Sequence, residues 1–548
     1  MKKFFILAVM GLALSTTIHA QEHINDVQLR KLQQAEFFIS NMYVDPLEDE
    51  KLVDAAIEGM LKQLDPHSTY VKAKDVEKST ENLNGSFEGV GIQFQMVEDT
   101  LVVVKTVSGG PCEKQGVMPG DRILEVNDTT IAGVKITNAD ILRKLRGPKG
   151  SRVKLGIQRP GVEGINTFFI IRDRIPVYTV DSHFMAEPGI GYIKIDSFGA
   201  NTLDEFMTAI NELKEKGMTR LIIDLQGNGG GYLQTAVQLA NEFLANGERI
   251  LSQKGNRPGR DSEQVYYANG TGVLQTLPVV VLVDSYSASA SEILSGALQD
   301  NDRGLIIGRR TFGKGLVQRP IELADKSVIR LTTAHYYTPT GRCIQKPYEM
   351  GDIKSYQKDI EDRLNSGELT NIDSIHFADS LKFETLHLGR TVYGGGGIMP
   401  DYYVPLDTTI YTKLHREMSA KGCINNTVFK YMDRNRKNLE KRYKNKDISY
   451  FKTNFKLTED LFDILREEAR KSKIEFSEEN FAEAKPMVGN VLKALIARDI
   501  WETSAYYELM NINNNIYVKG LEIIKGDEAI KMTQQKTQKQ KEKLNQQP

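Results

Sequence analysis

Hydrophobic residues recur at helical spacing in two segments near the beginning of the chain, residues 26–42 and 48–64. Asp45-Pro46 separates the segments, and this pair favours a turn. The pattern predicts a helical hairpin, which we assign to an N-terminal helical region of residues 21–83. Its apolar positions are Val27, Leu29, Leu32, Ala35, Phe38, Ile39, Leu52, Ala55, Ala56, Gly59 and Leu64.

At residue 84 the pattern changes to short apolar runs divided by glycine and proline, and it stays so to residue 174. Such runs are typical of strands joined by turns. The runs are residues 91–94, 101–104, 122–126 and 153–157, and a helical segment at 138–145 interrupts them. We expect a small β-barrel domain over residues 84–174.

Residues 175–405 alternate between the two patterns. Strands are expected at 190–195, 220–225, 277–284 and 304–308, and helices at 203–216, 233–244 and 290–299. This alternation predicts a mixed α/β core with a parallel sheet. Residues 346–386 are rich in charge and are interpreted as an insertion into this core.

Residues 406–533 are rich in lysine and mostly helical in pattern, so we expect a helical C-terminal domain. The core positions expected in it are Leu461, Ile464, Ala469, Val488, Val491, Leu492, Leu495 and Ile496. Residues 534–548 are mainly glutamine and lysine. Because such a segment has little apolar surface to bury, it is predicted to be a disordered tail.

The first 20 residues have the parts of a secretory signal peptide: Lys2 and Lys3, an apolar run from Phe4 to Leu14, and small residues before Ala20. The apolar run, of about 11 residues, is too short to span a bilayer, which takes about 20. We expect cleavage after Ala20 and an exported protein, periplasmic if the source is Gram-negative and otherwise extracellular. No later window suggests a second anchor, so no stable membrane anchor is expected after cleavage.

Composition excludes several classes of protein. The 548 residues include 71 basic and 72 acidic side chains, a formal net charge of -1, so no strong attraction to nucleic acid is expected. Hydrophobic residues make up 40% and charged residues 26%, which excludes a wholly disordered chain. Cys112, Cys343 and Cys423 are too few and too far apart for a disulfide scaffold or a zinc cluster.

Three serines alternate with small residues where the strand 277–284 gives way to the helix that begins near residue 290. The segment reads Asp-Ser-Tyr-Ser-Ala-Ser-Ala-Ser-Glu from Asp284 to Glu292, which leaves room for a substrate backbone. A hydroxyl at a helix N-terminus lies where the helix dipole stabilises negative charge. The ordinary alternative is a serine N-cap with Glu292 as its capping-box partner. The serines alone do not decide between the two.

A second segment with candidate catalytic residues follows the strand expected at 304–308. Residues 309–318 read Arg-Arg-Thr-Phe-Gly-Lys-Gly-Leu-Val-Gln, in which Lys314 and Gln318 are four apart and share one face of a strand or helix. Glycine-rich segments follow Asp224 and occupy residues 394–397.

These segments, in this order and behind the β-rich domain, resemble the carboxyl-terminal processing proteases, also called tail-specific proteases, over residues 26 to about 405. The resemblance implies that Ser289 is the nucleophile, Lys314 its general base and Gln318 the residue that holds the lysine. It also implies an oxyanion hole formed by the backbone amides of Gly230 and Ala290.

The β-rich domain resembles a PDZ domain of bacterial proteases. The resemblance is carried by Gly89, Val90, Gly91 and Ile92, by residues 116–123 and by the helix at 138–145. A Gly-x-Gly-apolar segment before a strand leaves amides for a peptide carboxylate, while the strand edge pairs with the peptide. The resemblance also suggests Arg146, at the end of that helix, as a docking sensor. The alternative to a PDZ domain is an ordinary small β-barrel. The alternative to a docking sensor is that Arg146 is simply a solvated arginine at a turn.

The chemistry of a Ser–Lys pair fits these residues. A lysine with a pKa of about 10.4 is neutral in only roughly one molecule in 2,500 at pH 7, but burial can bring the pKa near 7. Glycines on both sides of Lys314 permit tight packing around the amine, and Ser–Lys pairs are a known variant of the serine triad. Gln226 stands where the family usually has arginine, which removes a salt bridge but no catalytic group.

Other classes fit less well. Residues 308–314 match Gly-x4-Gly-Lys of a phosphate loop, but Gly315 stands where Ser or Thr should bind magnesium. Residues 229–231 do not reach the spacing of a dinucleotide site, and no Gly-x-Ser-x-Gly elbow accompanies His183 or His335. A non-proteolytic PDZ scaffold would lack the serine or the lysine.

The fold expected is therefore a multidomain α+β and α/β chain with a helical N-terminal region, a PDZ β-barrel, a mixed α/β protease core and a helical C-terminal extension. The function expected is an exported serine endopeptidase that captures C-terminal tails and needs no metal or organic cofactor. Its partners would be protein or peptide substrates with free C-termini. A homo-oligomer and an adaptor protein are both compatible with the sequence.

Overall fold

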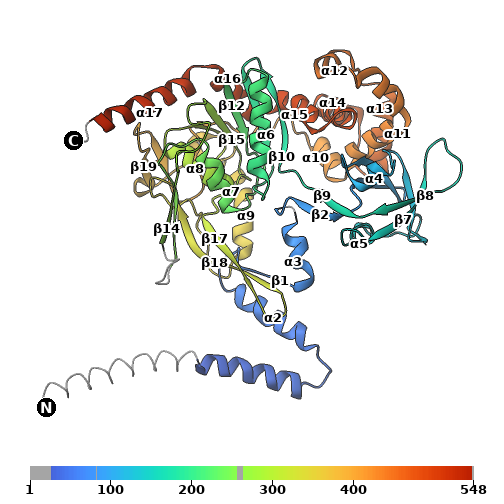
Figure 1. Ribbon diagram of the computed structural model, residues 1–548, viewed down its shortest axis with the longest axis horizontal. Helices are drawn as coiled ribbons and strands as arrows, with labels where there is room; N and C mark the ends of the chain where they lie inside the picture. Colours follow the sequence, from blue (N-terminus) through green and yellow to red (C-terminus); the bar gives the residue numbers. More distant parts are fainter. Residues whose placement is uncertain (1–25, 82, 256–262, 546–548) are drawn as a thin grey trace. The chain divides into compact units, whose positions relative to one another are not determined.

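The computed structural model describes residues 26–81, 83–255 and 263–545, so the predicted signal peptide, residues 1–20, lies outside the described residues. The chain divides into two compact units. The first contains the described residues up to Val76 together with Gln318–Thr332 and Tyr348–Gln357, and the second contains the rest of the chain. Figure 1 labels the helices and strands.

Helices form much of the first unit, which confirms the helical N-terminal region. Residues 26–42 are helical, and α2 (Asp49–Leu61) follows them. The helix 26–42 leaves large apolar side chains exposed, among them Phe37, Phe38 and Met42. Beyond α2, strand β1 (Thr69–Val71) pairs antiparallel with residues 328–330, and α3 (Ala73–Thr80) continues the chain into the second unit.

The predicted PDZ domain contains a sheet in the order β3-β4-β5-β7-β8, with β6 beside β5. Its strands are β3 (Ile92–Val97), β4 (Thr100–Thr106), β5 (Arg122–Val126), β6 (Thr129–Thr130), β7 (Arg152–Gln158) and β8 (Asn166–Ile171). Helices α4 (Pro111–Lys114) and α5 (Asn138–Leu145) pack on this sheet, while β2 (Ser86–Gly89) pairs with β9 (Asp173–Pro176). Because β3 is the first strand of the order, it forms an edge of the sheet.

The α/β core is built on a sheet in the order β10-β11-β12-β15-β16-β21. β10 (Val180–Glu187) is antiparallel to β11 (Ile190–Ile195). The remaining strands, β12 (Arg220–Asp224), β15 (Val279–Val283), β16 (Leu305–Gly308) and β21 (Tyr402–Tyr403), continue β11 in parallel. Helices α6 (Thr202–Glu215), α7 (Leu233–Asn241) and α8 (Ala290–Asp300) lie between successive strands in the sequence. The predicted mixed α/β core is therefore confirmed.

Different parts of the chain cover the two faces of this sheet. β11, β12, β15 and β16 lie side by side in chain order, and right-handed crossovers then place their helices on one face. Side chains such as Ile223 and Val281 pack on that face against α6, α7 and α8. Because strand side chains alternate, Ile222 and Leu282 point to the opposite face.

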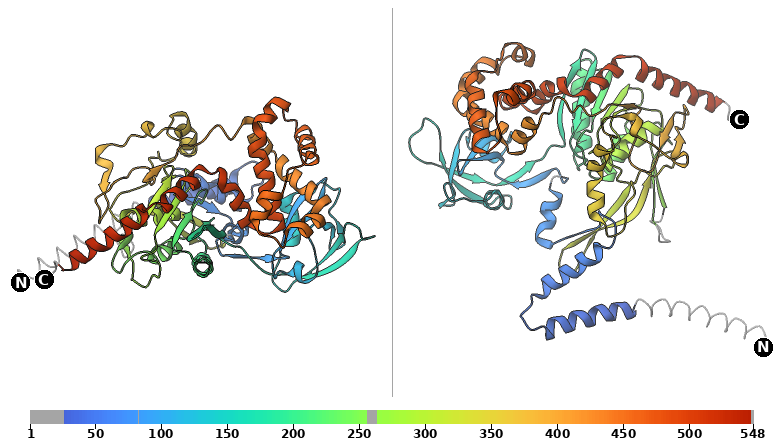
Figure 2. Two further views of the ribbon diagram at one scale, coloured as in Figure 1. Left: turned by 90° about the horizontal axis from the view of Figure 1, so that it is seen from above. Right: turned by 180° about the vertical axis from the view of Figure 1, so that it is seen from behind.

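The C-terminal helices cover that opposite face. They are α15 (Thr503–Met510), α16 (Asn515–Lys525) and α17 (Glu528–Asn545). Ile516, Tyr517 and Ile524 of α16 are buried with Ile222 and Leu282 in one apolar cluster. Figures 1 and 2 show α16 against strands β12 and β15.

Helix α17 differs from the predicted disordered tail of residues 534–548. The structure continues the helix to Asn545, and residues 546–548 lie outside the described residues. Ala529, Met532 and Lys536 are buried on one side of α17. Lys536 Nζ pairs with Glu248 Oε1 at 2.8 Å, and burial lowers the pKa of the lysine. A buried ion pair anchors this segment, which a count of apolar residues does not reveal.

Residues 413–500 form a helical domain with its own hydrophobic core, which confirms the predicted helical extension. Its helices are α10 (Lys413–Ala420), α11 (Cys423–Tyr443), α12 (Ile448–Asn454), α13 (Glu459–Lys471) and α14 (Glu478–Ile500). The predicted core positions are buried, except Val491, which is partly buried. In the described part of the chain, no helix has the length and apolar character needed to cross a membrane.

The remaining strands and the insertion complete the core region. β13 (Arg249–Lys254) pairs with β14 (Glu263–Tyr267) and with the end of β18 (Val328–Tyr337). β17 (Leu316–Glu322) begins after the loop that contains Lys314. Within the predicted insertion lie α9 (Ile353–Asn365), the 3-10 turns η1 (Ile372–Ser374) and η2 (Asp379–Leu381), and β19 (Lys382–Glu384), which pairs with β20 (Thr391–Tyr393).

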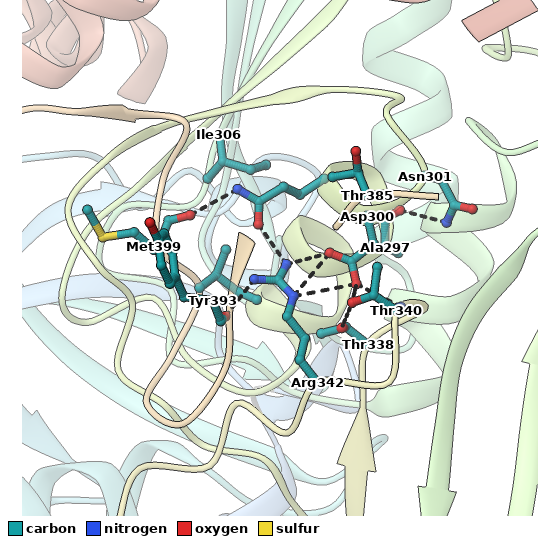
Figure 3. A network of polar contacts seen from close by, with 12 residues as sticks. Ala297, Asp300, Asn301, Ile306, Thr338, Thr340, Arg342, Thr385, Tyr393 and Met399 are labelled. Atoms are coloured by element: carbon teal, nitrogen blue, oxygen red, sulfur yellow. Dashed lines mark hydrogen bonds and ion pairs between the residues drawn. The ribbon is translucent and has the colours of Figure 1, made fainter. Parts of the chain in front are cut away.

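A buried ion pair fixes the C-terminal end of α8 (Figure 3). Asp300 and Arg342 are both fully buried, and the Arg342 guanidinium donates to the Asp300 carboxylate. Arg342 also donates to Gln299 Oε1 and to the Tyr393 carbonyl, each at 2.7 Å, while Thr340 Oγ1 donates to Asp300 at 2.7 Å. These hydrogen bonds replace the water molecules that the two charged groups lose on burial.

Candidate functional site

The serine segment forms a sharp turn between strand β15 and helix α8. Ser289 immediately precedes the helix and has φ 57° and ψ -113°. A positive φ costs a residue with a side chain about 1–3 kcal/mol and is found preferentially at functional sites. The turn therefore holds Ser289 in a strained conformation between strand and helix.

The serines of this turn differ in their environment. Ser287 and Ser291 are fully buried, and their hydroxyls donate to the carbonyls of Leu225 at 2.8 Å and Asn228 at 3.0 Å. Ser289 is partly exposed. Two of the hydroxyls thus hold the glycine-rich loop against the turn, and the middle one is the serine that solvent reaches.

The glycine-rich loop after β12 passes directly beside Ser289. Gly230 has φ +102°, and a Cβ placed on it would lie 2.7 Å from Cβ of Ser289 and 3.0 Å from the Ala290 nitrogen. The structure therefore brings the predicted oxyanion residues, Gly230 and Ala290, to the predicted nucleophile. The Gly230 amide donates to Asn228 Oδ1 at 2.8 Å. Ala290 opens α8, where N–H groups have no acceptor within the helix.

A buried carboxylate joins the serine turn to the lysine loop. Glu292 is fully buried, and its Oε2 accepts from the backbone nitrogens of Ser289 at 2.8 Å and Lys314 at 2.9 Å. Its Oε1 accepts from the Gly313 nitrogen at 2.8 Å and from Thr311 Oγ1 at 2.5 Å. Burial raises the pKa of Glu292 above its usual range, although these donors oppose the rise.

Three further hydrogen bonds hold the same segments together. Tyr336 Oη donates to the Ser289 carbonyl at 3.2 Å, and the Tyr336 nitrogen donates to the Gly315 carbonyl at 2.9 Å. The Phe312 nitrogen donates to the Ser287 carbonyl at 3.0 Å. The backbones at Ser289 and Lys314 are consequently fixed next to each other from several sides.

Lys314 and Gln318 do not share one strand or helix, contrary to the expectation from their spacing. β17 begins at Leu316, so Lys314 lies in the preceding loop and not on the strand that contains Gln318. The glycines at 313 and 315 extend this loop, and Gly313 has φ +88°. A strand nevertheless follows Lys314, where a phosphate loop would have a helix. Gln318 belongs to the first unit, where its Nε2 donates to Thr332 Oγ1 at 3.2 Å.

Gln226 does not leave Asp224 without a cation. Lys194 Nζ lies 3.6 Å from Asp224 Oδ1, and both side chains are buried. Tyr192 Oη also donates to Asp224 at 2.7 Å. The salt bridge that the sequence seemed to lose at residue 226 is supplied instead by β11.

The predicted peptide-binding residues lie together at the entrance to β3. Gly89 ends β2, Val90 is buried, Gly91 has φ +74° and Ile92 begins β3. Since β3 is an edge strand, a peptide strand could be added to the sheet by pairing with the outer edge of β3.

Arg146 is held by other side chains of the second unit. Its guanidinium forms an ion pair with Glu81 and lies 4.8 Å above the ring of Phe87. Arg146 is therefore not a freely solvated arginine.

Sequence reasoning missed residues that organise this site. Glu292 was recognised only as a capping partner of Ser289, and the half of that capping box in which Glu292 accepts from the Ser289 nitrogen is present. Asn228 and Tyr336 were not singled out. The asparagine lies within the glycine run and was a detectable signal, whereas the contact of Tyr336 depends on tertiary structure.

We predict that Glu292→Ala lowers the free energy of unfolding by about 3–5 kcal/mol, because it leaves buried donors unpaired. Glu292→Gln should lose less, since one oxygen still accepts. Urea unfolding of both variants measures this loss. Glu215→Gln is the matched control, since Glu215 is exposed at the end of α6 and its replacement should leave stability unchanged. A Glu292→Ala variant as stable as this control would contradict the bridging role.

Comparison with known proteins identifies the domains. Residues 189–355 match Peptidase family S41, residues 89–164 match the PDZ domain and residues 11–75 match the activating protease CtpB N-terminal domain. Residues 414–502 match a family of unknown function, DUF8443.

Similar proteins carry consistent names. The carboxy-terminal processing protease CtpA of Bacillus subtilis is 36% identical over 401 residues, 68% of this chain and 83% of that protein. The carboxy-terminal-processing protease of Bartonella bacilliformis is 35% identical over 354 residues, 63% of this chain and 80% of that protein. Among solved structures, the photosystem II D1 C-terminal processing protease is 26% identical, with a TM-score of 0.34 and coverage of 68% and 86% of the two chains. The chain belongs to the carboxy-terminal processing proteases of peptidase family S41 and is a serine-type peptidase with a PDZ domain.

Proposed function

We propose that this peptidase is an exported endopeptidase that cleaves with a dyad of Ser289 and Lys314, supported by Gln318. The observation that carries the proposal is the Glu292 bridge, because one carboxylate oxygen accepts from the backbone nitrogens of both dyad residues. The exposure of Ser289 favours it over Ser287 and Ser291, whose hydroxyls are committed to carbonyls.

In the proposed reaction Ser289 Oγ attacks the carbonyl carbon of the scissile peptide bond while Lys314 Nζ takes its proton. The carbonyl oxygen becomes an oxyanion beside the Ala290 amide, and each oxyanion donor contributes about 3–4 kcal/mol. Lys314 then gives the proton to the leaving amine as the C–N bond breaks. Water, deprotonated by the same lysine, hydrolyses the acyl-enzyme and restores Ser289.

The Gly230 amide is the second oxyanion donor in this proposal. It donates to Asn228 Oδ1 in the structure, so the oxyanion must replace Asn228 as its acceptor. The Gly230 amide would exchange the neutral oxygen of Asn228 for the charged oxyanion. Hydrogen bonds to charged acceptors are stronger than hydrogen bonds to neutral ones.

Gln318 is proposed to orient Lys314, as the resemblance to the family implies. Within the first unit, the Gln318 amide nitrogen donates to Thr332 Oγ1, and that hydroxyl donates to Asp65 Oδ1 at 2.9 Å. These hydrogen bonds fix the side chain of Gln318 within its own unit.

The PDZ domain is proposed to bind the C-terminal carboxylate of the substrate at residues 89–92 and its backbone along β3. Arg146 is proposed to sense this docking, because its ion pair with Glu81 connects α5 to the segment that precedes the domain. Export is proposed from the signal-like residues 1–20, which places the protein in the periplasm of a Gram-negative source or outside the cell otherwise.

We expect Ser289→Ala to abolish cleavage of an unfolded protein without a loss of stability. Ser287→Ala and Ser291→Ala should retain activity but lower the free energy of unfolding by about 0.5–1.5 kcal/mol, because each removes one buried hydrogen bond to a carbonyl that keeps its backbone donor. Gel-based cleavage assays and urea unfolding measure the two effects. An inactive Ser287→Ala variant beside an active Ser289→Ala variant would reassign the nucleophile.

Lys314→Arg should be as inactive as Lys314→Ala, since a guanidinium does not give up its proton near neutral pH. Gln318→Ala should keep partial activity. The wild-type rate should rise with pH through an apparent pKa well below the ordinary lysine value of about 10.4. An active arginine variant, or a rise delayed to that ordinary value, would argue against a lysine base.

Cleavage of one unfolded substrate should be at least about tenfold faster with a free C-terminus than with an amidated one, which corresponds to about 1.4 kcal/mol of differential binding. Changing the substrate is preferable to changing Gly91, because a side chain there would be strained and would lie 3.1 Å from Ile175. A free tail peptide added in excess is the control and should compete only with the unblocked substrate. Equal rates for both substrates would remove tail recognition from the proposal.

A further inference from the structure

The C-terminal extension contacts the glycine-rich loop of the active site through one side chain. Asn514 lies immediately before α16, and its Nδ2 donates to Oε1 of Gln226 at 3.2 Å. Gln226 is the second residue after β12 and opens the loop that leads to Gly230. We infer that Asn514 is a positioning residue, which holds this loop in the geometry that the oxyanion hole requires. The inference rests on the proposed function.

The orientation of the Asn514 amide is fixed by its role as an N-cap. Its Oδ1 accepts from the backbone nitrogens of Ile516 at 3.1 Å and Tyr517 at 3.2 Å. The nitrogen is therefore the atom that faces Gln226. Ile516 and Tyr517 are buried against the sheet, and the Tyr517 ring lies 5.5 Å from that of Tyr192. The donor is thus attached to a rigid part of the core.

The orientation of Gln226 is fixed in the same way. Its Nε2 donates to Asp224 Oδ2 at 3.2 Å and its backbone nitrogen donates to Asp224 Oδ1 at 2.8 Å. Its carbonyl accepts from Lys194 Nζ. Oε1 is the atom of the side chain that accepts from Asn514, and an amide supplies this acceptor together with the donor to Asp224. Arginine at this position would offer donors alone.

A short stretch of chain connects this contact to the reacting groups. The Gly227 nitrogen donates to Asp284 Oδ1 at 3.0 Å, and the Asn228 carbonyl accepts from Ala288 at 3.0 Å. Gly230 follows, so close to Ser289 that a Cβ added to it would lie 2.7 Å from Cβ of Ser289. Oxyanion donors act at about 2.7–3.1 Å, and a displacement of about 1 Å reduces catalysis strongly. Loosening the start of the loop should therefore reduce turnover more than substrate binding.

Asn514→Asp separates positioning from capping. Aspartate is as good an N-cap as asparagine, so α16 keeps its start. It lacks the donor, however, and presents a carboxylate oxygen to Oε1 of Gln226. Asn513→Asp is the matched control, because it makes the same change in charge at the adjacent, exposed residue.

We expect Asn514→Asp to lower kcat on a short peptide about tenfold, with KM changed less than about twofold and with an unchanged Tm. Its affinity for a peptide boronate, whose serine adduct places an oxygen in the oxyanion hole, should fall by a similar factor. The apparent pKa of the rate profile should stay the same, because the base is untouched. Asn513→Asp should match the wild type in all five quantities.

The partner substitution tests the contact itself. Gln226→Arg should also lower kcat, because the capped amide of Asn514 then faces a donor. The double variant Asn514→Asp/Gln226→Arg restores a donor–acceptor pair and should recover kcat beyond the product of the single effects.

Wild-type kcat in Asn514→Asp, an equal loss in Asn513→Asp, a loss explained by a lower Tm, or additive effects in the double variant would each overturn the inference. Failure of the proposed function is recognised separately, because wild-type cleavage would then be absent or would persist in Ser289→Ala.

Discussion

The order of strands in the protease sheet imposes a constraint on the whole chain. Successive parallel strands lie side by side in chain order, so the helices between them cover one face only. The other face contains Ile222, Val280, Leu282 and Ile307, all buried. At about 25 cal/mol per Å² of apolar surface, leaving such a face in water would cost many kcal/mol. Helices α15–α17 supply the cover, and the C-terminal extension is therefore part of the protease core.

The proposed active site follows from this rigid sheet, and a buried carboxylate joins its two segments. Ser289 follows one strand of the sheet, whereas Lys314 lies in a loop twenty-five residues later in the sequence. Glu292 accepts hydrogen bonds from the backbone nitrogens of both residues and belongs to helix α8. The C-terminal end of this helix is fixed by the ion pair of Asp300 and Arg342. A carboxylate suits this position because it accepts several hydrogen bonds at once and donates none. The strained backbone of Ser289 persists because these surroundings determine it.

Much of the fold was predictable because its elements have strong local patterns. The strands 190–195, 220–225 and 304–308 and the helix 138–145 lie within one residue of their predicted bounds. Helix α17 was not predictable in this way, because Lys536 is buried through a charge and not through apolar surface. The expectation that Lys314 and Gln318 share one face of a strand or helix was wrong, since the glycines beside Lys314 extend the loop to Gly315.

The site was predictable only as far as its segments carry their own signals. The serine run and the glycine runs can be found by reading along the chain. By contrast, Asn514 lies in an asparagine-rich segment that reads as a loop, and its partner Gln226 is 288 residues away in sequence. A contact of this kind depends on the closure of the sheet by α16, which no local pattern records.

The same extension also reaches the PDZ domain. Gln95, Val102 and Arg122 are paired across β3, β4 and β5, so their side chains lie on one face of that sheet. Val102 is 1% exposed, yet it lies outside the apolar cluster of the PDZ core. Helix α11 explains its burial, since Asn426 and Asp433, two turns apart on one side of the helix, bind Gln95 and Arg122.

The helical domain therefore contacts β3 on the face of the sheet that points away from the PDZ core. After that domain the chain reaches Asn514, whose side chain contacts the glycine-rich loop at Gln226. β3 is the strand to which a substrate tail is proposed to add, and the loop is proposed to bind the oxyanion. The proposed tail-binding strand and the proposed oxyanion loop therefore both contact the C-terminal extension, the strand through α11 and the loop through Asn514.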